Sequence, residues 1–433
     1  MGSFAGERRC SSGFGENWGI IPEELRGYRV EQIRKQVLEQ LDMTREHEEE
    51  EVLAVIDEEI CRAAKERVIP LNWRRELRMQ VFHSLRKLDV LQELLNEDDV
   101  TEIMVNGADH IFYEKKGQIL PWDKCFSSRE KLEDIIQQIV GNHNRMVNEA
   151  EPIADTRLED GSRVNVVLPP VALEGPVVSI RKFPKHPLLM EQMIDGGSIS
   201  RECAEFLEKL VKAGYNIFIS GGTGSGKTTF LNALSEFIPK SERVITIEDS
   251  AELQLQGIEN LVRLETRTGG PEGTLAVTIR DLIRTALRMR PDRIIVGEIR
   301  GAECLDMLQA MNTGHDGSLS TGHANSSQDM LSRMETMVLM GMELPLLVIR
   351  SQIAAGVDIL VHLGRLRDRS RRMLSIAEVA GVEENGIRLN PLYEFTEMGE
   401  QDGRIAGSWV KTGELIHRGK LYRAGMEEIC EGL

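Results

Sequence analysis

One glycine-rich octapeptide constrains the fold of this chain more than any other segment. Residues 221–228 read Gly-Gly-Thr-Gly-Ser-Gly-Lys-Thr and match the phosphate-binding pattern G-x-x-x-x-G-K-[ST] at every position. The apolar run Asn216–Ser220 before the octapeptide predicts a buried strand, and Lys227–Phe237 after it predicts a helix. Because a glycine-rich turn between a strand and a helix N-terminus can hold phosphate, the sequence predicts an α/β domain built around this turn.

The chemistry of this loop can be assigned residue by residue. Its glycines allow backbone N–H groups to turn toward phosphate oxygens. Lys227 is expected to direct its charge at the outer phosphates, and the Thr228 hydroxyl is expected to hold Mg²⁺. A glycine-rich turn without a ligand is the alternative interpretation. The predicted nucleotide-binding residues of the loop are Gly221, Gly222, Thr223, Gly224, Ser225, Gly226, Lys227, Thr228 and Thr229.

Length and composition limit the class of protein. A chain of 433 residues can form two or three domains. Its apolar runs, such as Leu344–Ile349, are too short to span a bilayer, and residues 1–30 lack the pattern of a secretory signal. Six scattered cysteines without a C-x-x-C pair favour a reducing cytosol over a disulfide framework or structural zinc. The formal charge of −17 argues against nucleic-acid binding by the molecule as a whole.

The pattern of apolar residues divides the region before residue 201 into four segments. Residues 1–20 are rich in Gly and Ser and predict a flexible leader. Residues 96–183 alternate short strand-like pieces with one helix and predict an α+β domain, and residues 184–200 predict a linker because they contain prolines and a Gly-Gly pair. Residues 21–95 predict a helical module because they carry three stripes at helical spacing: Val30, Ile33, Val37 and Leu41; Leu53, Ile56, Ile60 and Ala63; Trp73, Leu77, Val81 and Leu85.

Buried strands alternate with helices from residue 201 onward. This alternation predicts a mostly parallel sheet that is covered by helices on both faces. Parallel sheets bind ligands at the carboxyl ends of their strands, which is also where the glycine-rich loop falls. A hairpin-like tail is expected after Arg367, with strands at Arg372–Val379 and Gly386–Leu392. The expected strands of the sheet are residues 217–220, 243–247, 261–265, 293–296, 318–321 and 358–363.

Two further strands of this sheet end in carboxylates. Ile294–Val296 leads to Glu298, and Ile245–Ile247 leads to Glu248. An acid in this position stands near Mg²⁺ and the attacking water, and a glutamate is long enough to orient that water. We therefore predict that Glu298 orients water and approaches Mg²⁺ partly through water, with Glu248 assisting. The alternatives are a helix-capping acid for Glu298 and a solvated strand end for Glu248.

Two histidines, His315 and His323, bracket the expected strand at residues 318–321. No nearby cysteine or third histidine completes a zinc set. Because this strand is expected beside the phosphate site, His323 is predicted to contact the γ-phosphate and to report whether ATP or ADP is bound. A structural histidine is the alternative.

The phosphate loop, the two strands that end in acids and the segment with the two histidines resemble four motifs of the type II and type IV secretion ATPases. In chain order, these motifs are the Walker A loop, aspartate box, Walker B strand and histidine box. They are residues 221–228, 245–252, 294–301 and 314–323. Upstream, Val100–Gly107, Asp160–Asn165 and Ser179–Phe183 resemble the CpaF branch, which powers assembly of Flp (tad) pili. The four-cysteine zinc insertion of many type II relatives is absent from the sequence, in agreement with this branch. The resemblance covers about residues 85–395.

The resemblance implies a RecA-like P-loop ATPase domain at residues 201–433, preceded by the α+β domain, with six copies in a ring. It implies ATP as substrate, Mg²⁺ as cofactor and catalytic roles for Glu298, Glu248 and Lys227. Arg163 and Arg181 would reach nucleotide phosphates across an interdomain cleft, although each could be an ordinary surface charge. The homo-hexamer would push on an inner-membrane platform protein, so the chain would be cytoplasmic and peripheral at the inner face of the cell membrane.

Other functions stay open at this point. A type IV secretion ATPase that supports DNA or protein export shares the core motifs. A small-molecule phosphotransferase would need an acceptor pocket or lid, and none is evident in the sequence. A nucleotide-gated regulator or scaffold would bind ATP without turnover. The helically spaced row Arg280, Arg284 and Arg288 could meet acids of a neighbouring subunit or form a solvated face.

Overall fold

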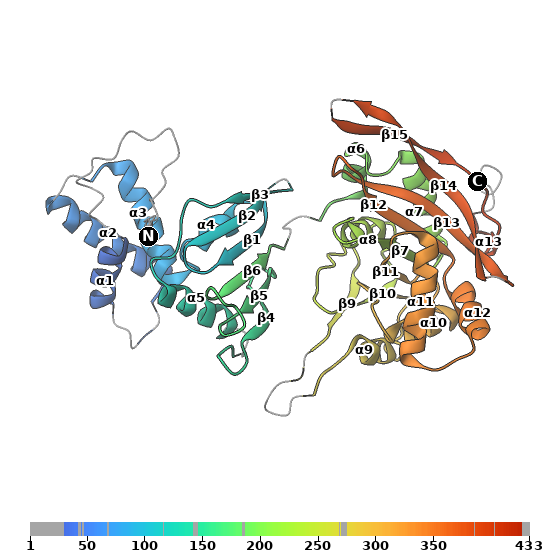
Figure 1. The fold of residues 1–433 in the computed structure, drawn as a ribbon, viewed down its shortest axis with the longest axis horizontal. Helices are drawn as coiled ribbons and strands as arrows, with labels where there is room; N and C mark the ends of the chain where they lie inside the picture. The colour runs from blue at the N-terminus through green and yellow to red at the C-terminus, as the bar shows by residue number, and fades with distance from the viewer. Residues whose placement is uncertain are drawn as a thin grey trace, which may run out of the picture. The chain divides into compact units, whose positions relative to one another are not determined.

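The computed structural model describes residues 30–41, 45, 47–66, 69–115, 117–141, 146–183, 187–267, 269, 275–384, 386–401 and 403–426. The expected leader at residues 1–20 lies outside this part of the chain. The chain forms two compact units, Met1–Lys185 and His186–Leu433 (Figure 1).

Three helices begin the first unit and share one small core. They are α1 (Val30–Gln40), α2 (Glu49–Glu66) and α3 (Leu71–Arg86). Three glutamates in the first turn of α2 interact favourably with the positive end of the helix dipole. The three expected helices are confirmed, because the core is built from residues of the predicted stripes and two neighbours, Val52 and Phe82. Its members are Ile33, Val37, Val52, Ile56, Ile60, Leu77, Val81 and Phe82.

An antiparallel sheet of six strands completes the first unit, in the order β3-β2-β1-β6-β5-β4. Its buried face packs against α5 (Arg129–Gly141) and the short helix α4 (Leu91–Asn96). Burial alternates along the strands, so the other face carries the polar side chains. The α+β prediction is confirmed, although β3 and β4 were not expected. The strands are β1 (Val100–Asn106), β2 (His110–Lys115), β3 (Gln118–Pro121), β4 (Ile153–Arg157), β5 (Arg163–Val167) and β6 (Val177–Arg181).

The second unit is built on a sheet of nine strands, in the order β15-β14-β13-β12-β7-β11-β10-β8-β9. The six strands from β12 to β9 in this order pair in parallel, and they are the six that the sequence predicted. Their carboxyl ends therefore meet at one edge of the sheet. These strands are β7 (Ile217–Gly221), β8 (Arg243–Glu248), β9 (Asn260–Glu265), β10 (Arg293–Val296), β11 (Leu319–His323) and β12 (Ile359–Arg365).

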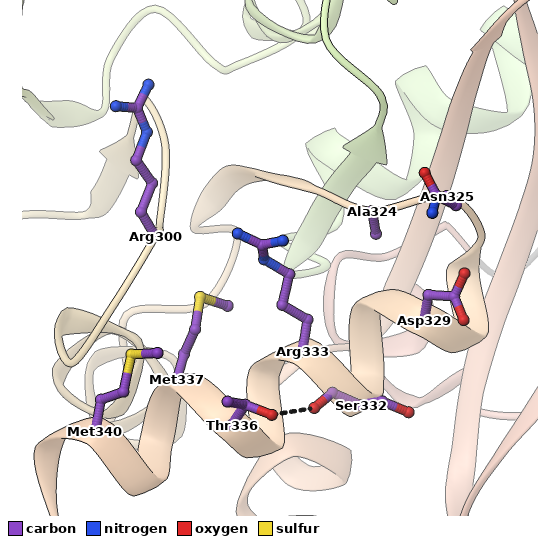
Figure 2. A pocket seen from close by; sticks show the side chains of 9 residues that line it. All are labelled: Arg300, Ala324, Asn325, Asp329, Ser332, Arg333, Thr336, Met337 and Met340. Carbon is purple, nitrogen blue, oxygen red and sulfur yellow. Dashed lines mark hydrogen bonds between the residues drawn. The ribbon is translucent and has the colours of Figure 1, made fainter.

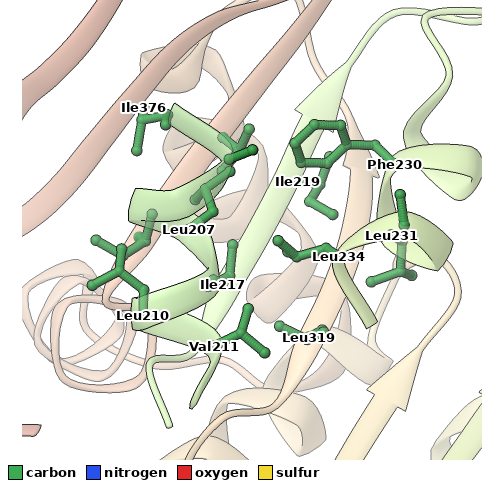
Figure 3. Close-up of a cluster of buried hydrophobic side chains, with 14 of the residues drawn as sticks. Leu207, Leu210, Val211, Ile217, Ile219, Phe230, Leu231, Leu234, Leu319 and Ile376 are labelled. Atoms are coloured by element: carbon green, nitrogen blue, oxygen red, sulfur yellow. The ribbon is translucent and has the colours of Figure 1, made fainter. Parts of the chain in front are cut away.

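Helices cover both faces of this sheet. On one face, α7 (Arg201–Lys212) and α8 (Lys227–Ser235) pack on Ile217 and Ile219 of β7 (Figure 3). On the other face, Phe218 of β7 enters a second apolar cluster with the remaining helices. Because successive residues of β7 enter opposite clusters, both faces of the strand are buried, as a parallel sheet requires. The helices of the second cluster are α9 (Ile279–Ala286), α10 (Glu303–Asn312), α11 (Ser327–Gly341) and α12 (Leu346–Gly356).

The structure differs from the sequence prediction at two segments. The expected linker at residues 184–200 contains the helix α6 (Met190–Asp195), whose methionines Met190 and Met193 are buried in the core of the second unit. Six residues carry too short an apolar pattern to predict a helix. The expected C-terminal hairpin is not a separate tail, because three long strands extend the main sheet by antiparallel pairing. They are β13 (Arg371–Glu383), β14 (Gly386–Gln401) and β15 (Arg404–Lys411), followed by α13 (Gly419–Arg423).

Two arginines of the row on α9 form hydrogen bonds with an acid of the same chain. Arg280 Nε donates to Asp306 of α10 at 2.7 Å, and Arg284 Nε donates to the other oxygen of Asp306 at 2.8 Å. Arg288 lies beyond the end of α9. Neither alternative considered for this row describes the contact, which joins two helices of one protomer.

Four of the six cysteines are described by the structure. Cys125 is disulfide-bonded, whereas Cys61, Cys203 and Cys304 are free.

In the described part of the chain, no single helix combines the length and apolar composition of a bilayer span. Taken together, α11 and α12 meet the criterion of length and composition, but they meet at a bend of 117°.

Candidate active site

The predicted phosphate loop joins β7 to α8. Strand β7 ends at Gly221, and α8 begins at Lys227 after Gly226, whose φ of 92° is left-handed. A Cβ on Gly221 would lie 2.5 Å from the Leu363 carbonyl oxygen and equally close to Ser225 Oγ, so only glycine fits there. The base of the loop is thus pressed against β12, while residues 222–224 are exposed.

The loop carries the donors that a phosphate group needs. The first N–H groups of α8 have no partner within the helix and are oriented for an anion. Ser225 Oγ is buried and has no hydrogen-bond partner among the described residues. Lys227 is buried, and its Nζ donates to the carbonyls of Gly221 and Gly222 at 3.0 Å each. Burial lowers the pKa of Lys227, so an anion would be a better partner for its ammonium than these two carbonyls.

Lys227, His323 and Glu298 form one line of contacts across three neighbouring strands. Lys227 Nζ lies 3.2 Å from His323 Nδ1, and His323 Nε2 lies 2.7 Å from Glu298 Oε1. Because an ammonium only donates, Nδ1 must accept, so the ring N–H is at Nε2, next to Glu298 Oε1. Burial is the main cause that lowers the pKa of His323, which favours this neutral form at pH 7. His323 therefore connects the phosphate-binding cation to the acid.

Both carboxylate oxygens of Glu298 are engaged. His323 contacts Oε1, and Arg300 Nη2 donates to Oε2 at 2.7 Å. The side chain of Glu298 is 20% exposed, so the acid lies at the edge of the site, within reach of solvent. Sequence reasoning did not single out Arg300, although a basic residue two positions after a strand-end acid is a visible signal.

Glu248 ends β8, the strand beside β10. Its Oε2 accepts hydrogen bonds from the backbone N–H groups of Glu252 at 2.6 Å and Leu253 at 2.9 Å, whereas its Oε1 is buried without a partner among the described residues. Burial raises the pKa of Glu248 to about 7. A Cβ on Gly297 would lie 2.9 Å from Glu248 Cγ, so glycine before Glu298 lets the two strand ends approach. Glu248 can therefore change protonation near neutral pH.

The predicted Mg²⁺ ligands, Thr228 and Glu298, do not form a preassembled metal cage. No group of three or more His, Cys, Asp or Glu side chains in the described ranges could hold a metal ion. Mg²⁺ that accompanies a triphosphate usually takes one or two protein oxygens and completes its shell with phosphate oxygens and water. A hydroxyl at the start of α8 and a strand-end carboxylate are a donor set of that kind.

Arg163 and Arg181 are cross-strand neighbours in the six-stranded sheet of the first unit. Strand pairing sets Arg163 opposite Arg181, and it sets Arg157 of β4 opposite Arg163. Directly opposed residues share one face, so the three arginines form a row on the polar face of the sheet. The side chain of Arg181 is 67% exposed, with Glu102 Oε1 at 3.8 Å from its Nε. Arg157 was missed because β4 itself was not predicted.

A cavity of about 510 Å³ lies along α11, and Arg300, the partner of Glu298, is part of its wall. Arg300 enters the cavity from the segment between β10 and α10, and Arg333 enters it from α11. The thioethers of Met337 and Met340 lie between these two stretches of backbone (Figure 2). A group bound there would meet the guanidinium that holds Glu298. The cavity is lined by Arg300, Ala324, Asn325, Asp329, Ser332, Arg333, Thr336, Met337 and Met340.

Comparison with known proteins identifies the family of this chain. Residues 84–396 match the model of the type II/IV secretion system proteins. The chain belongs to this family. It is 35% identical over 300 residues to a putative conjugal transfer protein of Mycobacterium tuberculosis, covering 68% of this chain and 85% of that protein. It is 33% identical over 312 residues to the type IV secretion system protein PtlH of Bordetella pertussis, covering 66% of this chain and 91% of that protein.

A solved structure of another ATPase has the same fold. The ATPase DotB of Yersinia pseudotuberculosis matches with a TM-score of 0.50 and 18% identity, over 68% of this chain and 79% of that one. The RecA-like fold expected for the second unit is therefore confirmed. The match to the secretion family begins near the end of α3 and ends within β14, so it includes the six-stranded sheet and all six parallel strands and leaves α1, α2 and β15 outside.

Proposed function

We propose that this chain is an ATPase of the CpaF branch that powers assembly of a Flp (tad)-type pilus or a related secretion machine. One observation carries the ATPase assignment. Lys227, His323 and Glu298 contact one another in series at the ends of three neighbouring strands, directly beside a phosphate loop. ATP hydrolysis needs a cation on the outer phosphates and a base that orients water, and this series supplies both. Membership of the secretion family supports the coupling of hydrolysis to transport.

Binding of ATP rearranges the contacts of Lys227. The ammonium leaves the carbonyls of Gly221 and Gly222 for the β and γ phosphates, where its charge is better matched. The N–H groups of the loop and the Ser225 hydroxyl bind the remaining phosphate oxygens. Thr228 and, partly through water, Glu298 would hold Mg²⁺, which would supply positive charge against the phosphates.

His323 couples phosphate binding to the acid. Its N–H at Nε2 lies beside Glu298 Oε1 in the present arrangement, and a γ-phosphate oxygen is an acceptor for this N–H. When the N–H donates to the phosphate, Oε1 of Glu298 is left to accept a proton from the attacking water. Glu248, with a pKa near 7, assists as a second acid at the same edge. Hydrolysis of ATP removes the γ-phosphate, and the resting contacts of His323 return.

The remaining parts of the proposal concern assembly. Six copies form a ring, and the row of Arg157, Arg163 and Arg181 binds the nucleotide phosphates when the first unit closes on the second. Repeated closure and opening pushes on a platform protein in the inner membrane, which holds the ring at the cytoplasmic face of that membrane. A formal charge of −17 supports a protein partner rather than direct contact with nucleic acid.

A type IV secretion ATPase is the second candidate. The names of the relatives from Mycobacterium tuberculosis and Bordetella pertussis favour it, because they refer to conjugal transfer and type IV secretion. A neighbouring gene for a pilin or a Flp-type platform protein favours pilus assembly, and neighbouring genes for a conjugation channel favour the second candidate.

The variant Glu298→Gln tests the ATPase assignment. Its kcat is expected to fall about 10²- to 10⁴-fold, because the amide cannot accept the proton of the water, while ATP binding is retained. Phosphate release is measured with and without the platform protein. Hydrolysis by Glu298→Gln at the wild-type rate overturns the assignment. A wild-type protein that binds ATP without turnover in either condition is a regulator instead.

A further inference from the structure

An arginine from the C-terminal strands contacts the phosphate loop. Arg371 is the first residue of β13, directly after the turn that follows β12. Its Nε donates to the carbonyl oxygen of Gly224 at 2.9 Å. Its Cδ lies 3.5 Å from the place where a Cβ on Gly226 would stand. Arg371 therefore reaches the outside of the loop at both of these glycines, although it lies far from them in sequence.

The turn that precedes Arg371 is held by hydrogen bonds to Asp368. The Asp368 carboxylate accepts from the Ile405 backbone N–H of β15 at 2.8 Å, and from the backbone N–H and hydroxyl of Ser370 at 2.9 and 2.6 Å. The hydrogen bond from Ile405 is the main reason that the pKa of Asp368 is lowered to about 2. Arg371 also pairs with Arg365 in the ladder of β12 and β13. The position of Arg371 is thus fixed by the sheet.

The carbonyls of the phosphate loop explain what Arg371 can do. A loop that turns its N–H groups toward an anion turns carbonyl oxygens the other way, and these oxygens need donors of their own. Lys227 donates to two of them, at Gly221 and Gly222, and Arg371 donates to a third, at Gly224. Lys227 gives up its two hydrogen bonds when its ammonium turns to the phosphates. Arg371 can keep its hydrogen bond, because it approaches from outside.

We propose that Arg371 is a positioning residue of the phosphate site, which fixes the outer half of the loop for a nucleoside di- or triphosphate. The guanidinium also brings a permanent positive charge next to the bound anion. The proposal rests on the ATPase function. Because Arg371 makes no hydrogen bond or ion pair with Glu298 or His323 among the described contacts, its loss affects nucleotide affinity far more than the hydrolytic step.

The test compares Arg371→Gln with the matched variant Arg369→Gln. Both changes remove one exposed charge from the same turn, but Arg369 has no hydrogen bond to the loop among the contacts described. The dissociation constant of a fluorescent ADP, the KM for ATP, kcat and the unfolding temperature are measured on the full-length chain. Arg371→Gln is expected to raise the dissociation constant and KM about tenfold, the effect of one charge-assisted hydrogen bond, with kcat within about twofold of wild type.

Two further variants sharpen the result. Arg371→Lys keeps the charge and is expected to recover part of the affinity. Asp368→Asn loosens the turn from β15 and is expected to weaken ADP binding in the same direction, but less than Arg371→Gln. An unchanged unfolding temperature of nucleotide-free Arg371→Gln separates a positioning role from a loss of folding.

Three outcomes count against the proposal. Wild-type affinity in Arg371→Gln overturns it, and so does an equal loss of affinity in Arg369→Gln, which would reduce the effect to bulk charge. A kcat that falls as far as KM rises also overturns it, because a positioning residue for binding alone would not do this. Failure of the ATPase function looks different, because wild-type protein would then release no phosphate from ATP, whether or not it binds fluorescent ADP.

Discussion

The amino and carboxyl ends of the parallel strands differ in how their buried polar groups are paired. At the amino end of β7, the Asn216 amide accepts hydrogen bonds from Gly317 and Ser318 at 2.9 and 3.0 Å and donates to Gly356 at 2.7 Å. At the carboxyl edge, Ser225 Oγ and Glu248 Oε1 are buried without partners among the described residues. The same strands thus end in a complete hydrogen-bond network on one side and an incomplete one on the other.

This difference shows which edge is built for a ligand. A buried polar atom without a partner costs about 1–3 kcal/mol, so a fold retains one where the missing partner arrives with a bound molecule. Burial also raises the pKa of Glu248 and lowers that of Lys227, and these two groups stand at the carboxyl edge. Changes at the carboxyl edge should therefore alter turnover, and changes at the amino edge should alter stability.

After Glu298→Gln, the largest effect is expected from Glu248→Gln. An amide cannot take up a proton at this position, so kcat should fall about 10²- to 10³-fold. The hydrogen bonds from Glu252 and Leu253 can be kept by the amide oxygen, and the fold should persist. Steady-state phosphate release and circular dichroism check the two expectations. Full activity in this variant would remove Glu248 from the catalytic edge.

The pH dependence of stability tests the burial of Glu248 directly. Its pKa is raised from 4.5 to about 7, so the folded chain holds this proton more tightly than the unfolded chain does. The free energy of unfolding should therefore fall as pH rises from 4.5 to about 7, by roughly 3 kcal/mol from this group. Denaturant unfolding of wild type and Glu248→Gln at several pH values isolates the contribution. A difference between the two proteins that does not change with pH contradicts the raised pKa.

Asn216→Ala probes the opposite edge. It removes the partner of Gly317, Ser318 and Gly356 and leaves these backbone groups buried, which should lower the free energy of unfolding by about 2 kcal/mol. Well below its unfolding temperature, the variant should hydrolyse ATP at close to the wild-type rate. Chemical denaturation measures the loss of stability, and an ATPase assay on the same sample measures turnover. A large loss of turnover in a folded variant would contradict the proposed difference between the two edges.

The smallest effect is expected in the first unit. If Arg163 and Arg181 bind phosphate oxygens, the double variant Arg163→Gln, Arg181→Gln should raise KM for ATP about tenfold while the fold is retained. Arg129→Gln is the control, because Arg129 is an exposed arginine of the same unit paired with Glu133. Equal KM values in the double variant and the control would leave these two arginines as surface charges.

The features predicted from the sequence were those that a local apolar pattern marks, whereas features that depend on the pairing of distant strands were missed. The phosphate loop, Glu298 and His323 could be found because each follows a short apolar strand, and six parallel strands were predicted in this way. Arg300 was overlooked, although it follows Glu298 by two residues in the sequence. Arg157 and Arg371 could not be found. Their roles depend on which strands lie side by side, and β4 and the start of β13 carry no strong apolar period of their own. Helix α6 was missed because one buried pair, Met190 and Met193, is too weak a signal.

Retention of radiolabelled ATP by the purified chain is the most direct test that the carboxyl edge is a nucleotide site. Wild type and Asn216→Ala should retain the label, and Lys227→Ala should lose it, because the ammonium that turns from the Gly221 and Gly222 carbonyls to the phosphates is gone. A wild-type protein that retains no label, or a Lys227→Ala protein that retains as much as wild type, would contradict the account.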